Sequence, residues 1–142
     1  MNMIGIDPGQ SGGIAFIPPA GIARAWKMPE TERDVLDLLR SLSSPDGVRA
    51  TIERVGPMPK QGISSTAKFM THYGGLRMAL IACEIPFQAV PPGVWQRSMG
   101  CLTHGDKNIS KRRAQELFPL IKVTHALADA LLIAEYGRRT AT

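Results

Sequence analysis

Three short apolar segments, separated by turns rich in glycine, proline and serine, open the chain and restrict its fold more than any other feature. They are MIGID at 3–7, GIAFIP at 13–18 and GIARAWKM at 21–28. Short apolar runs joined by such turns are typical of neighbouring antiparallel strands. The chain is therefore expected to begin with a three-stranded antiparallel meander.

After this meander the hydrophobic period changes, and helices alternate with strands. A helix is expected over 30–42, a strand at 48–53, a long helix at 64–84 and a strand at 86–90. A short helix containing Trp95, a helix over 107–117 and a last helix over 124–138 follow. This order predicts an α/β fold with a mixed five-stranded sheet, three antiparallel strands and then two parallel ones, flanked by helices.

The length and the cysteine content restrict the class of protein. A chain of 142 residues fits a single domain, 1–142. No segment reaches the ~18 uncharged apolar residues of a membrane helix, and the first residues do not resemble a signal peptide. Cys83 and Cys101 are too few for a disulfide framework. A cytoplasmic protein that is not secreted is expected.

Positive charge gathers in the middle of the chain. The net charge is +5, but residues 54–113 carry nine basic and two acidic side chains, whereas residues 1–53 carry five basic and seven acidic ones. A basic segment suits phosphate contacts, because neutralised phosphates release counterions. The same excess would also keep an ordinary surface solvated, so charge alone leaves both readings open.

Three acidic residues stand in apolar surroundings. Asp7 and Glu53 each end an apolar strand, and Asp129 lies in THALADALLIA. Burying an unpaired carboxylate is costly, and a divalent cation such as Mg²⁺ would satisfy all three at once. His125 precedes Asp129 by four residues, so both side chains would lie on one helix face.

Each of these residues also has a simpler explanation when taken alone. Asp7 could be a turn residue, and Glu53 could form an ion pair on the surface. Asp129 could be a charge favoured near a helix N-terminus, and His125 could be a packing residue. Their combination in one small domain favours the metal site.

Five segments carry a resemblance to a known family. They are IGIDPGQSGGIA, TIERV, QAVPPGVWQRSMG, GDKNISKRRAQELFP and HALADALLIAEYGRR. They resemble, in this order, the first strand and turn, the second acidic strand, the last strand, the basic helix and the final helix of the RuvC family of Holliday junction resolvases. The resemblance covers nearly the whole chain and implies a ribonuclease H-like fold. The short length is similar to that of the phage and organelle forms, so the expected setting is a bacterial or phage-infected cell.

The resemblance implies a homodimeric endonuclease that cuts a four-way DNA junction symmetrically, one strand in each active site. The metal-binding and catalytic residues then fall on Asp7, Glu53, His125 and Asp129, which would hold a pair of Mg²⁺ or Mn²⁺ ions. Many relatives place the partner of the last acid three residues before it, which would point to Ala126 instead of His125. No nucleotide cofactor and no membrane partner is expected.

Contacts with DNA are expected mainly from the basic middle of the chain. Lys107 matches a DNA-contacting lysine of the family, and Lys60, Lys111 and Arg112 are expected to neutralise phosphates. The helix over 64–84 is expected to form part of the dimer contact. Its apolar residues are Met70, Leu76, Met78 and Leu80.

Two positions depart from the family pattern. Gly56 stands where an aromatic wedge is common, and Trp95 replaces another DNA-contacting lysine. Trp95, Tyr73 and Met58 are candidates for stacking on bases near the crossover, with ordinary core packing as the alternative.

Three other functions are compatible with parts of the sequence. A sugar kinase or ATPase begins with a similar strand and turn, but needs a longer chain, and no Walker-type phosphate loop occurs here. A non-catalytic junction-binding protein is disfavoured by the three acids. A ribonuclease H-like nuclease that acts on other branched DNA or on structured RNA remains the alternative.

Overall fold

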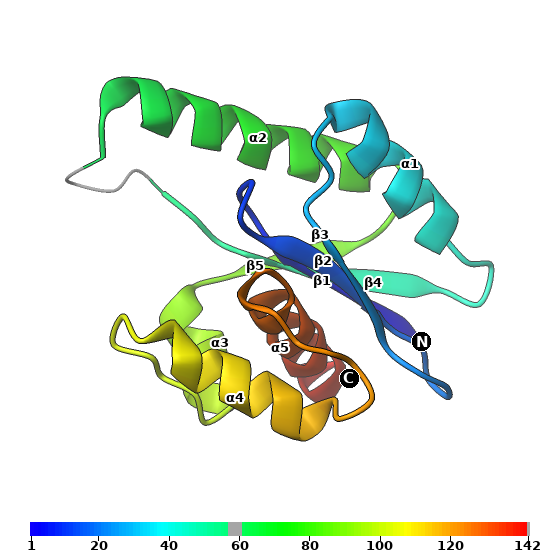
Figure 1. Cartoon of the computed structure of the whole chain (residues 1–142). Helices are drawn as coiled ribbons and strands as arrows, with labels where there is room; N and C mark the ends of the chain where they lie inside the picture. Colours follow the sequence, from blue (N-terminus) through cyan, green and yellow to red (C-terminus); the bar gives the residue numbers. More distant parts are fainter. Residues whose placement is uncertain (57–60, 142) are drawn as a thin grey trace.

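A mixed β-sheet lies at the centre of the molecule (Figure 1). The computed structural model describes residues 1–56 and 61–141, and within these ranges five strands form one sheet. The strands are β1 (Asn2–Asp7), β2 (Gly13–Ile17), β3 (Arg24–Lys27), β4 (Val48–Glu53) and β5 (Phe87–Val90). Their order across the sheet is β3-β2-β1-β4-β5. The first three strands pair antiparallel, and β4 and β5 are added in parallel to β1, which confirms the predicted fold class.

Helices cover both faces of this sheet. They are α1 (Glu32–Leu42), α2 (Ile63–Ala82), α3 (Pro92–Ser98), α4 (Lys107–Leu117) and α5 (His125–Thr140). Figure 1 places α1 and α2 on one face and α3, α4 and α5 on the other. Most elements begin and end within a few residues of the expected positions. The third strand is shorter than expected, because Gly21 has a φ of +115° and belongs to the preceding turn.

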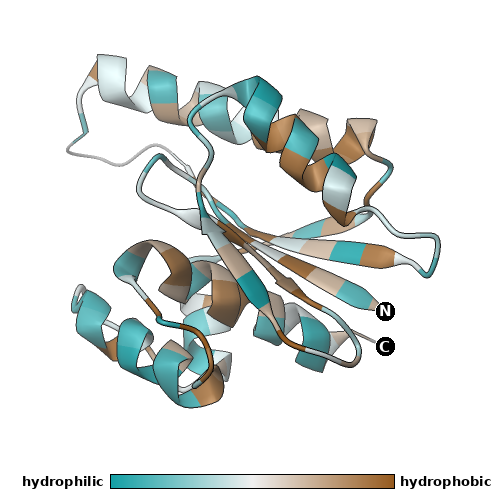
Figure 2. Cartoon of the chain, turned by 45° about the vertical axis from the view of Figure 1, so that its right-hand side comes forward, coloured by the Kyte–Doolittle hydropathy of each residue, from teal (hydrophilic) through white to brown (hydrophobic). Residues whose placement is uncertain are grey.

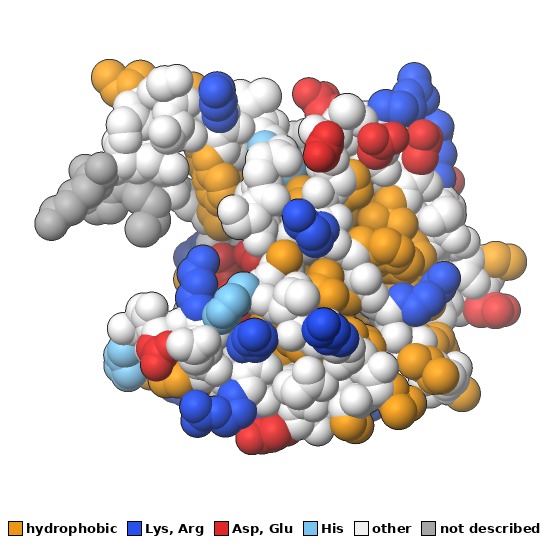
Figure 3. All heavy atoms as spheres, in the orientation of Figure 1, with side chains coloured by type: hydrophobic (Ala, Val, Ile, Leu, Met, Phe, Trp, Pro, Cys, Tyr) orange, Lys and Arg blue, Asp and Glu red, His pale blue; other side chains and the backbone are white. Residues whose placement is uncertain are grey.

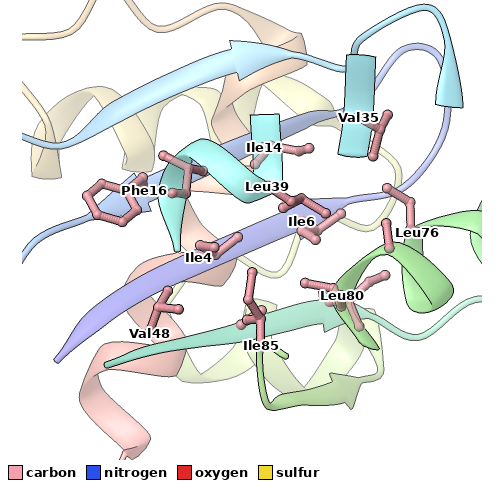
Figure 4. Close-up of a cluster of buried hydrophobic side chains, with 14 of the residues drawn as sticks. Ile4, Ile6, Ile14, Phe16, Val35, Leu39, Val48, Leu76, Leu80 and Ile85 are labelled. Atoms are coloured by element: carbon pink, nitrogen blue, oxygen red, sulfur yellow. The ribbon is translucent and has the colours of Figure 1, made fainter. Parts of the chain in front are cut away.

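Side-chain alternation along β1 divides the core into two parts. Ile4 and Ile6 point to the face covered by α1 and α2, where they join a cluster with Leu39 and other buried residues (Figure 4). Met3 belongs to the cluster on the opposite face, under α5. The helix α4 packs against α5, and most of its residues are hydrophilic (Figure 2). None of the described helices has the length and apolar character required to cross a membrane.

Most of the residues expected to form the dimer contact on α2 are not exposed. Leu76 and Leu80 are buried in the core of their own chain, so they are unavailable to a partner. The exposed apolar residues of this helix are Ile63, Met78 and Ile81. Only Met78 of the expected contact residues is among them.

Small residues allow α5 to lie directly on β1 and β2. A Cβ atom at Gly5 would overlap the backbone of Ala130 and Ala134, and one at Gly13 would stand 2.6 Å from the carbonyl oxygen of Ala126. The backbone of α5 therefore lies close to the sheet at its alanines. The helix is therefore fixed against the strand that ends in Asp7.

We expect Gly5→Ala to lower the free energy of unfolding by about 3 kcal/mol, because the added methyl group has no space between β1 and α5. Gly74→Ala is the matched control. No described atom lies within 4 Å of a Cβ placed at Gly74 in α2, so alanine there should stabilise the protein by about 0.5–1 kcal/mol. Urea denaturation checks both values, and equal stabilities of the two variants would contradict the close packing of α5.

Candidate functional site

Three predicted acids come together where β1, β4 and α5 meet. β1 and β4 are parallel neighbours with Ile6 paired to Ile52, so Asp7 and Glu53 follow at the same edge of the sheet. Asp129 lies in the second turn of α5, which packs on β1. The sheet and helix therefore place three carboxyl groups in one region.

The pKa values of these groups are raised mainly because the groups are buried. Burial raises the pKa of Asp7 from its ordinary value of 3.8 to about 8. The charges of Asp129 and Glu53 also raise this pKa, whereas the charge of Lys107 lowers it. The pKa of Glu53 is raised to about 7, again mainly by burial. Burial also raises the pKa of Asp129. The Ser110 hydroxyl and the charges of Lys107 and His125 lower it. Such a group becomes fully ionised at neutral pH only with a compensating cation.

The donor atoms suit a hard divalent cation. Carboxylate oxygens are the ligands that Mg²⁺ and Mn²⁺ prefer, and Oδ1 of Asp129 is buried with no hydrogen-bond partner among the described residues. Within residues 1–56 and 61–141, no three His, Cys, Asp or Glu side chains are already close enough to hold a metal ion. The residue types therefore fit a cation, but its binding would require the carboxylates to move closer together.

His125 and Lys107 stand at the margin of the acidic group. His125 is the first residue of α5 and is exposed, and its charge lowers the pKa of Asp129. Ala126, the alternative position, has no ligating side chain and presents its backbone to Gly13. Lys107 is the first residue of α4 and is exposed, yet its charge acts on all three acids. Figure 3 shows acidic side chains recessed in a hollow with basic side chains beside it.

Two of the expected stacking residues are core residues. Trp95 has no exposed surface, and its Nε1 donates a hydrogen bond to Oε2 of Glu53 at 2.8 Å. Tyr73 is only 7% exposed and packs in the cluster under α1 and α2. The burial of both side chains favours the alternative of ordinary core packing over stacking on DNA bases. Met58 and Lys60 lie outside the described residues.

The other two basic candidates lie on α4, and they differ in exposure. Arg112 is exposed, whereas Lys111 is partly buried. Sequence reasoning missed two residues near the acids: Trp95 as a partner of Glu53, and the buried Ser110. The sequence offered one signal for Trp95: it follows, by a few residues, a strand that neighbours Glu53. The side chain of Ser110 gave none.

A separate cavity of about 890 Å³ lies between α1 and α2. It reaches the turn after β1 at Gly9 and Gln10, and Phe69 and His72 of α2 also line it. None of the four predicted metal ligands lines this cavity. The acidic group is therefore adjacent to the cavity through the β1 turn but is distinct from it.

Comparison with known proteins identifies the fold. No protein-family model and no curated protein matches this sequence. The structure of Thermus thermophilus RuvC is similar over 98% of this chain and 96% of its own, with a TM-score of 0.65 and 18% identity. The structure of T. thermophilus RuvC in complex with Holliday junction substrate has a TM-score of 0.69 and 18% identity, and the match covers 100% of this chain and 98% of that one. The chain therefore has the ribonuclease H-like fold of RuvC, as its sequence predicts.

Proposed function

We propose that this protein is a structure-specific endonuclease that resolves four-way DNA junctions by metal-dependent hydrolysis of phosphodiester bonds, acting as a homodimer. The observation that carries the proposal is the convergence of three carboxyl groups at the ends of β1 and β4 and near the start of α5. This convergence occurs in a fold whose solved relatives include a RuvC bound to a Holliday junction.

The acidic group would hold the cations. The charges of Glu53 and Asp129 both act on Asp7, so these three carboxylates would hold the cations together. Asp129 offers an oxygen without a partner among the described residues, and His125 stands beside it. When bound, Mg²⁺ or Mn²⁺ supplies Lewis-acid activation of the attacking water and of the phosphate.

Basic residues around the acids would position the DNA backbone. Lys107 is exposed and close enough to act on all three acids, so its ammonium group can pair with a phosphate oxygen at the site. Lys111 and Arg112 follow on α4, and Lys60 belongs to the same basic part of the sequence. These contacts would fix the position of the junction without reading its bases.

A two-fold dimer would match the two-fold symmetry of a junction. The exposed apolar residues of α2 are the candidates for its contact: Ile63, Met78 and Ile81. Met78 and Ile81 lie three residues apart near the end of α2, so they can share one contact, whereas Ile63 lies at the other end of the helix.

A panel of substrates tests the proposed function. The purified protein is incubated in Mg²⁺ with a four-way junction, a linear duplex, a flap and a structured RNA. Paired nicks in opposite strands of the junction, with little cutting of the duplex, are expected. Preferential cutting of the flap or RNA would point to the alternative nuclease, and binding without cutting to a non-catalytic junction-binding protein.

We expect Lys107→Ala combined with Arg112→Ala to weaken junction binding and to make the slope of log affinity against log salt about two units less steep. Both side chains are exposed on α4, and each would neutralise one phosphate. Arg49→Ala, an exposed residue near the opposite end of β4, is the control and should keep the wild-type slope. An unchanged slope in the double variant would exclude these two residues from phosphate contact.

A further inference from the structure

We propose that Trp95 is a positioning residue for Glu53: its indole N–H holds Oε2 of the carboxylate and leaves Oε1 free for the cation. The proposal rests on the metal-dependent function proposed above.

The contact itself is well defined. Nε1 of Trp95 lies 2.8 Å from Oε2 of Glu53, which is the length of a strong hydrogen bond to a carboxylate. An indole has one donor and no acceptor, so the direction of the bond is fixed. The bond occupies one of the two carboxylate oxygens and restricts the rotation of the group.

The chain path explains why Trp95 reaches Glu53. Glu53 pairs with Val90 across the parallel strands β4 and β5, and the N–H of Arg54 donates to the carbonyl oxygen of Val90 at 2.8 Å. Pro91 caps α3, and Pro92 is its first residue, so the helix starts immediately beside Glu53. Trp95 then follows one turn later, with its own N–H directed to the carbonyl oxygen of Pro91.

Packing holds the indole in place. Trp95 has no exposed surface, and it belongs to the buried cluster beneath α5 that also contains Met99 and Leu131. A ring fixed in this way loses no further freedom when Glu53 binds a cation. Partners of metal-ligating side chains orient them, and removing such a partner typically weakens metal affinity by about 10–100-fold.

A simpler role for the hydrogen bond would be to satisfy the buried indole donor. In that case the bond contributes to folding, and cation binding does not depend on it. Cation affinity measured over a range of pH separates the two roles. The Trp95 bond lowers the pKa of Glu53, so a loss of affinity caused only by proton competition disappears at high pH, whereas a loss caused by misorientation of Glu53 remains.

The first experiment measures Mn²⁺ binding by calorimetry without DNA. We expect Trp95→Phe to weaken Mn²⁺ binding by about 10–100-fold, because phenylalanine fills most of the same space but has no N–H. Trp26→Phe is the matched control: Trp26 lies on β3, where Arg24 stacks on its ring at 5.4 Å, and its substitution should leave Mn²⁺ affinity unchanged. A folded Trp95→Phe protein with wild-type Mn²⁺ affinity would overturn the proposal.

A second experiment needs no substitution at Trp95. The protein has two tryptophans, and the Trp26→Phe spectrum assigns the two indole N–H signals in ¹⁵N-labelled protein. Addition of Mg²⁺ should shift the Trp95 signal and leave the Trp26 signal in place. An unmoved Trp95 signal at saturating Mg²⁺ would also overturn the proposal, even if Trp95→Phe failed to fold.

The outcomes distinguish this proposal from the proposed function. If the wild type binds Mn²⁺ and cuts junctions while Trp95→Phe binds Mn²⁺ equally well, only the positioning role of Trp95 fails. If the wild type binds neither Mn²⁺ nor Mg²⁺, the metal-dependent function fails, and the role of Trp95 fails with it.

Discussion

Asp7→Asn is expected to abolish junction cleavage in Mg²⁺ while junction binding stays near the wild-type level. Asparagine has nearly the same shape as aspartate but lacks the charge that a cation needs. Both other acids act on Asp7, so its loss removes one carboxylate from the group that would hold the cations. A rate at least about a thousandfold lower is expected, which corresponds to about 4 kcal/mol in the activation barrier. Single-turnover cleavage and a gel-shift titration measure the two properties separately.

Asp46→Asn provides a matched control for this prediction. Asp46 is exposed in the loop before β4, at the end of the sheet opposite to Asp7, and the same chemical change there should leave cleavage unaffected. If purified Asp7→Asn protein cuts the junction at a rate close to that of the wild type, the metal mechanism cannot be right. If Asp7→Asn loses junction binding as well, Asp7 has a structural role that the proposed mechanism does not include.

The sequence was sufficient to predict the fold because the elements carry strong local signals. The period of two in VRATIE and the Thr31 cap, which accepts a hydrogen bond from the N–H of Asp34, mark β4 and α1 without reference to the rest of the chain. The convergence of Asp7 and Glu53 was also predictable. Parallel strands that end in acids bring those acids to one edge of the sheet.

Other features depend on how helices are rotated about their own axes, which sequence patterns define poorly. Trp95 was expected to contact DNA, but α3 turns its indole into the core toward Glu53. Leu76 and Leu80 were expected in a dimer contact, but α2 directs them to the sheet. An apolar residue on a helix can face either the core of its own chain or a partner. Only the packed structure shows which of these it faces.

The second large effect concerns stability. The free energy of unfolding of the metal-free protein is expected to fall as pH rises from about 5 to about 8. Asp7 has a pKa of about 8 in the folded protein and an ordinary value of 3.8, so in this range the folded state retains a proton that the unfolded chain has released. Glu53, with a pKa of about 7 against 4.5, acts in the same direction. Since stability falls with pH where the folded state binds more protons, the loss should be on the order of a few kcal/mol.

Urea denaturation in a chelating buffer at pH 5 and pH 8 measures this change. Asp7→Asn should flatten the pH dependence, because the group with the largest shift is gone, whereas Asp46→Asn should keep the wild-type dependence. Mg²⁺ should restore stability at pH 8 more than at pH 5, since a cation binds the ionised carboxylates and stabilises the folded state in proportion to the logarithm of its concentration. A wild-type free energy of unfolding that does not change between the two pH values would mean that burial does not raise the pKa values of Asp7 and Glu53 as described. An equal effect of Mg²⁺ at both pH values would show that cation binding does not depend on the ionisation of these carboxyl groups.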